Sequence, residues 1–108
     1  MIPADLLDQL REKDPELWER YKQWSAHMDI YDETALQYIL QGELQEAIRA
    51  RGWHLYQIRN DDLPGLPCFA DIIILGHGKE HDFHHEGEGS TEAEALLRAY
   101  LAAIQEAA

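Results

Sequence analysis

The sequence predicts an α+β fold in which helices pack on a three-stranded antiparallel β-meander, an αβββα core, with a helical extension before it. Apolar residues recur at helical spacing in the first half of the chain, and an apolar strand over 68–75 precedes a short turn and a more polar strand. The chain then closes with an amphipathic helix. We expect a single domain over residues 1–108, with 1–31 as the extension and 32–108 as the core.

Two short helices are expected in the extension. Asp14 followed by Pro15 is typical of an N-cap and a first helical position, so the second helix should begin there. Trp18 and Trp24 lie on or beside the apolar stripe of this second helix. Aromatic residues at such spacing usually pack in a core, but they are also enriched at protein interfaces. We expect core packing, with a homodimer interface through Trp18 and Trp24 as the alternative.

A longer helix should follow the turn at 29–32, and Gly52 is suited to a left-handed cap at its end. Gly42 inside this helix predicts a kink or a close helix crossing. Strands are expected over 53–59, 68–75 and 80–86, joined by turns at 60–67 and 76–79. The four consecutive apolar residues at 72–75 predict a central strand that is buried on both faces.

The final helix is expected to open with a capping box formed by Thr91 and Glu94. This order of elements resembles the double-stranded RNA-binding domain, whose last helix follows a glycine-containing loop, a serine and a lysine pair. The segment Gly87-Glu88-Gly89-Ser90 is similar to that loop in shape. Thr91, Glu92 and Glu94, however, stand where positive charge would be needed to hold phosphates. We therefore expect no binding to duplex RNA.

Residues 43 to 104 also resemble the small bacteriophage and prophage αβββα sandwich proteins. The similarity rests on Ala50-Arg51-Gly52-Trp53 and on the stretch from Ser90 to Ala99, in which a Ser and a Thr precede Glu-Ala and a Leu/Arg/Ala-rich helix. The resemblance implies an accessory protein of phage or mobile-element origin. Inhibitors of host systems, including anti-CRISPR proteins, are common in that class.

The composition is strongly acidic, with 21 acidic against nine basic residues and a net charge of -12. Such a surface repels phosphate groups, so direct binding to nucleic acids or anionic membranes is not expected. We expect a non-catalytic cytoplasmic protein that binds and inhibits a host protein, acting as a nucleic-acid mimic on a basic surface. The candidate partner-binding residues are Asp29, Asp32, Glu33, Asp61, Asp62, Glu80, Asp82, Glu86 and Glu88.

A cluster of four histidines and three acidic residues occupies positions 77–86. His77, His81 and His85 could bind Zn²⁺ or Ni²⁺ across the hairpin, which would make the protein a metal-binding module. No recognised ligand spacing is present, so we favour a solvated hairpin without a cofactor. The metal site remains the alternative.

Motifs of known catalytic sites are absent from the sequence. It contains no Gly-rich phosphate loop, no His-Glu-x-x-His helix and no nucleophile elbow. The single cysteine, Cys68, lies in an apolar strand, where a small buried side chain is more typical than a nucleophile. We therefore expect no enzymatic activity.

Overall fold

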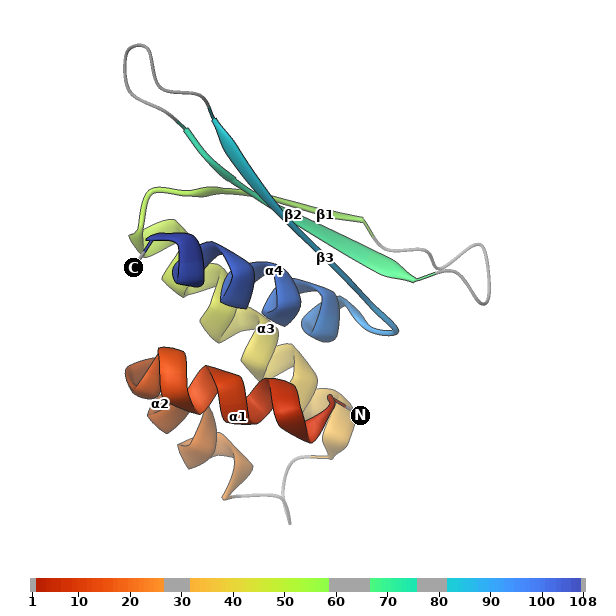
Figure 1. Ribbon diagram of the computed structural model, residues 1–108. Coiled ribbons are helices and arrows are strands. Elements are labelled where there is room, and N and C mark those ends of the chain that lie inside the picture. Colours follow the sequence, from red (N-terminus) through yellow and green to blue (C-terminus); the bar gives the residue numbers. More distant parts are fainter. Residues whose placement is uncertain (1, 27–31, 59–66, 76–81, 108) are drawn as a thin grey trace.

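The computed structural model describes residues 2–26, 32–58, 67–75 and 82–107. Within them it has four helices and a three-stranded antiparallel sheet in the order β1-β2-β3, which confirms the predicted α+β fold (Figure 1). The helices are α1 (Ala4–Lys13), α2 (Pro15–Ser25), α3 (Glu33–Ala50) and α4 (Glu92–Ala107). The strands are β1 (His54–Ile58), β2 (Cys68–Ile74) and β3 (Phe83–Gly89).

Helices α1 and α2 pack beneath the other two helices, on the side away from the sheet (Figure 1). Their apolar stripes supply the fully buried Leu10 and Leu17. The expected cap of α2 is present, because Asp14 Oδ1 accepts a hydrogen bond of 3.2 Å from the backbone N–H of Leu17. Pro15 holds the first helical position, as predicted.

Helix α3 follows a second aspartate cap and ends at Ala50, two residues before the predicted glycine, Gly52. Asp32 Oδ1 accepts a hydrogen bond of 2.8 Å from the N–H of Ala35. Gly52 has φ of 75°, the left-handed conformation that glycine adopts most easily. Of the two alternatives predicted for Gly42, the close helix crossing is wrong, because a Cβ added there would meet nothing within 4 Å, and the kink stays a prediction.

Strand β2 lies at the centre of the sheet, as predicted, but only its inner face is buried. Ala70 and Ile72 point into the core, whereas Phe69 is 40% exposed and Leu75 is 50% exposed. The prediction of burial on both faces was therefore wrong. The reason is visible in Figure 1, where all four helices lie on the same side of the sheet.

Strand β3 ends three residues later than predicted, at Gly89. Gly87 and Gly89 therefore belong to the strand, not to the loop that the resemblance to the RNA-binding domain implied. A Cβ on Gly87 would clash with the backbone of Ala95 and Ala99, and one on Gly89 would clash with the side chain of Glu94. The two glycines let α4 lie directly on β3.

Helix α4 contacts β2 and β3 as well as α3 and α1, and its Tyr100, Leu96 and Leu97 are fully buried. The predicted capping box is present with one change, because the reciprocal bond to the Glu94 carboxylate comes from the N–H of Ser90 and not from that of Thr91. The N–H of Glu94 donates to Thr91 Oγ1 over 3.2 Å, and the N–H of Ser90 donates to Glu94 Oε2 over 3.0 Å. The carboxylate of Glu94 is thus committed to the fold and contributes little charge to the surface.

Candidate partner-binding surface

The acidic residues predicted to bind a partner fall into three groups. Asp29, Asp61, Asp62 and Glu80 lie outside the described residues. Asp32 and Glu33 begin α3, where the Asp32 carboxylate already caps the helix. Asp82, Glu86 and Glu88 are exposed just before or within β3. Since Gly87 and Gly89 face the core, Glu86 and Glu88 project to the opposite side of the sheet.

We call the side of the sheet that faces away from the helices the outer face. Side chains alternate between the two faces of a strand, so the buried Ala70, Ile72 and Gly87 fix which residues point outward. The pairing of the strands places Tyr56, Asp71 and Glu86 in one row across the sheet. The outer face consists of His54, Tyr56, Phe69, Asp71, Ile73, His84, Glu86 and Glu88.

Exposed aromatic rings lie among the carboxylates of this face. Tyr56 is 64% exposed and Phe69 is 40% exposed. Isolated exposed apolar residues are common, but rings that gather on one uncovered face are typical of protein-binding surfaces. No described helix covers this face, so both rings are open to a partner.

Asp71 is the most unusual residue of the outer face. Aspartate is depleted in strands, yet Asp71 occupies the middle of the central strand. Its Oδ2 lies 3.2 Å from His84 Nδ1, whereas its Oδ1 is buried and has no hydrogen-bond partner among the described residues. A buried acceptor without a donor destabilises a fold.

A hollow of about 380 Å³ opens beside Asp71. Among the described residues that line it, none carries a positive charge. Aromatic faces attract cations, and carboxylates bind them through charge-assisted hydrogen bonds. The hollow is therefore suited to a cationic group. Its lining residues are Tyr56, Gln57, Phe69, Ala70, Asp71 and Glu86.

The structure separates the described histidines of the predicted metal cluster. His85 lies on the inner face, where its side chain is 10% exposed and its Nε2 is 4.0 Å from Glu106 Oε2 of α4. His84 lies on the outer face beside Asp71. His77 and His81 are outside the described residues. Within the part of the chain that the structure describes, no group of three His, Cys, Asp or Glu side chains could hold a metal ion.

The two tryptophans of α2 differ in their surroundings. Trp18 is partly buried against the hydrophobic core, and its ring centre lies 5.9 Å from that of Tyr21. Trp24 is 42% exposed. The expectation of core packing therefore describes Trp18 better than Trp24.

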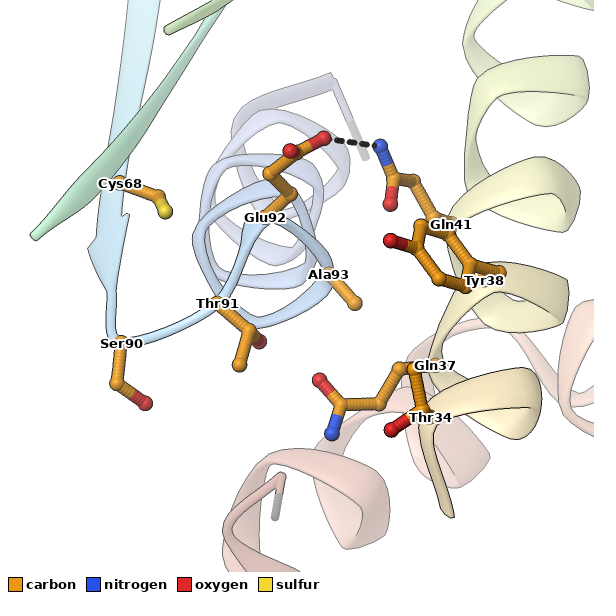
Figure 2. Close-up of a pocket in the computed structure, with 9 residues that line it drawn as sticks. All are labelled: Thr34, Gln37, Tyr38, Gln41, Cys68, Ser90, Thr91, Glu92 and Ala93. Atoms are coloured by element: carbon orange, nitrogen blue, oxygen red, sulfur yellow. Dashed lines mark hydrogen bonds between the residues drawn. The ribbon is translucent and has the colours of Figure 1, made fainter. Parts of the chain in front are cut away.

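A second, smaller cavity of about 250 Å³ lies between α3 and the beginning of α4 (Figure 2). Its walls carry the polar side chains of Thr34, Gln37, Tyr38 and Gln41 on one side and those around Thr91 on the other. Glu92 is the charged residue of the lining, and its Oε2 accepts a hydrogen bond of 2.9 Å from Gln41 Nε2. Cys68 also lines the cavity and is only partly buried, whereas a small buried side chain was expected.

Sequence reasoning missed Tyr56, Phe69 and Asp71 as site residues. A signal was present, because Phe69, Asp71 and Ile73 alternate with Ala70 and Ile72 along the strand. When an acidic residue occupies one of every second position along an apolar strand, the face formed by those positions is expected to meet water or a partner. The adjacent run of four apolar residues obscured this alternation.

No protein-family model, curated protein or solved structure matches this chain. None of the helices in the described ranges is long and apolar enough to cross a membrane.

Proposed function

We propose that this protein is a non-catalytic binding protein whose outer face docks on a basic surface of another protein. The observation that carries the proposal is the combination, on one uncovered face, of two exposed rings with the exposed carboxylates of Glu86 and Glu88. The resemblance to phage proteins adds the narrower proposal that the partner is a host protein and that docking inhibits it.

The two kinds of side chain have different roles in such an interface. Tyr56 and Phe69 offer apolar area whose burial would provide much of the affinity. Glu86 and Glu88 favour basic partners and disfavour acidic ones. The net charge of -12 also accelerates the approach of a basic protein, an effect that salt weakens.

Inhibition would follow from competition for one surface. A basic site that binds nucleic acid attracts carboxylates for the same reason that it attracts phosphates. While the outer face of this protein occupied such a site, the nucleic acid could not enter. Inhibition should therefore decrease as the concentration of the competing nucleic acid rises.

A capture experiment tests the proposal. The protein is immobilised covalently and exposed to bacterial lysate at about 0.1 M and 0.5 M salt, concentrations that differ in screening length. We expect a basic protein that is retained at low salt and lost at high salt. The variant Glu86→Gln/Glu88→Gln should lose it.

The matched control is Glu12→Gln/Glu19→Gln, which removes the same charge from exposed positions of α1 and α2. It should retain the partner. Equal retention by both variants would overturn the proposal, because net charge or another face would then account for the binding. Nucleic acid added as a competitor should displace the partner if the docking site is a nucleic-acid site.

A further inference from the structure

We infer that the hollow beside Asp71 receives an arginine side chain of the partner. The inference rests on the proposed function, since it assumes a basic partner, and it adds the chemical group that is recognised. The occupant is a partner segment that presents one guanidinium group to the outer face.

The geometry of the sheet brings the required groups to one place. Asp71 pairs with Tyr56 on one side and with Glu86 on the other. Side chains that are directly opposite each other in neighbouring antiparallel strands have Cβ atoms about 4.5–5.5 Å apart. Phe69 lies two residues away on the same face of β2. The ring of Tyr56 and the carboxylates of Asp71 and Glu86 therefore lie in one row across the outer face, and the ring of Phe69 lies next to that row.

The two carboxylates of Asp71 and Glu86 favour a donor with several N–H groups. The side chain of Asp71 is 28% exposed while its Oδ1 is buried, so an incoming donor approaches the exposed side of this carboxylate. A guanidinium group presents five N–H donors in a plane, so it can donate to Asp71 and to Glu86 at the same time. Glu86 is exposed and available for such a contact.

The exposed ring of Tyr56 distinguishes arginine from other cations. A guanidinium group is planar and weakly hydrated, so it stacks on an aromatic face while its edge donates hydrogen bonds. The lysine ammonium group is compact and strongly hydrated, and gains less from such a site. A second copy of this chain is a poor occupant, because two outer faces would bring their carboxylates together and each chain carries a charge of -12.

A titration followed by ¹⁵N–¹H correlation spectra tests the inference with N-acetyl-arginine amide as the probe. We expect saturable shifts confined to the backbone amides of β1, β2 and β3 around Tyr56, Asp71 and Glu86. N-acetyl-citrulline amide has nearly the same shape without the charge and should cause no such shifts. N-acetyl-lysine amide should bind more weakly than the arginine probe.

Two variants locate the binding. Asp71→Asn and Tyr56→Ala should each weaken arginine binding, Asp71→Asn by about tenfold or more, since it removes a charged acceptor. Tyr56→Phe keeps the ring and should bind normally, as should the control Glu12→Gln. The spectrum of each variant also reports whether it is folded. Unchanged binding in Asp71→Asn, or equal shifts with citrulline, would overturn the inference.

Failure of this inference can be told apart from failure of the proposed function. If the captured partner depends on Glu86 and Glu88 but tolerates Asp71→Asn and Tyr56→Ala, the arginine site is wrong and the docking face stands. If the arginine probe binds as expected but no basic partner is captured, the proposed function fails and the hollow remains a guanidinium site.

Discussion

The hydroxyl group of Tyr100 donates a hydrogen bond of 2.5 Å to Asp14 Oδ2, and this bond ties the last helix to the beginning of α2. Asp14 therefore has two roles, because its other oxygen caps α2 through the N–H of Leu17. Tyr100 is fully buried, so its hydroxyl group has exchanged water for this carboxylate. The N-terminal helices are thus attached to the core by a polar contact as well as by apolar packing.

Replacing Tyr100 with phenylalanine should lower the free energy of unfolding by about 2 kcal/mol, the usual contribution of a hydrogen bond to a charged group. The measurement is urea unfolding of both proteins. Asp14→Asn is the matched variant, because asparagine caps a helix as well as aspartate does. If the bond contributes as expected, the double variant will be less destabilised than the sum of the two single ones.

Alkaline pH should reveal the same contact. Burial first, and then the hydrogen bond and the charge of Asp14, raise the pKa of Tyr100 to about 12, against the opposing effect of Arg51. Above about pH 10 the unfolded chain loses this proton while the folded protein retains it. The free energy of unfolding should therefore fall between about pH 10 and pH 12, by up to about 1.4 kcal/mol per pH unit.

Tyr100→Phe lacks this titration, so the stability difference between wild type and variant should shrink as the pH rises from 9 to 11.5. Tyr21, whose pKa burial also raises, is present in both proteins and cancels in the comparison. A difference that stays constant over this range would contradict the raised pKa of Tyr100.

Gly42→Ala should stabilise the protein by about 1 kcal/mol. The space beside Gly42 is open, and glycine is the poorer helix former inside α3. Thermal unfolding should show a higher midpoint for the variant. A lower midpoint would contradict the expectation that position 42 is an ordinary helical position with open space beside it.

Gly87→Ala should have the opposite effect, because its methyl group would collide with the backbone of α4 at Ala95 and Ala99. Overpacking of this kind costs about 1–3 kcal/mol or more, since backbone cannot move aside as a flexible side chain can. The same thermal unfolding measurement applies, and Gly42→Ala serves as the control for the chemical change. Equal midpoints for Gly87→Ala and wild type would show that α4 does not approach β3 so closely.

The elements with strong local signals could be predicted from sequence. Asp14 with Pro15, the left-handed Gly52 and the capping box of Thr91 and Glu94 each act within a few residues, and all are present in the structure. The end of β3 could not be predicted from sequence, because two glycines so close together are typical of a loop. Their use in the strand depends on the approach of α4, a contact between distant segments.

The candidate site was harder to predict for a related reason. The apolar run in β2 indicated two buried faces, but whether a sheet is covered on one side or both depends on where the helices pack. Charge alone identified Glu86 and Glu88 as candidates. Grouping them with Tyr56 and Asp71 required the strand register, which the sequence does not reveal.

The one-sided arrangement of the helices also bears on how this protein could evolve. Substitutions on the outer face touch neither the hydrophobic core nor the contacts between helices, so most should leave the stability of the fold nearly unchanged. If the outer face is the docking surface that we propose, recognition and folding would be specified by different residues of the same strands. A lineage facing a changing target could vary one set freely while the other stays fixed, and a protein engineer could randomise the outer face in the same way.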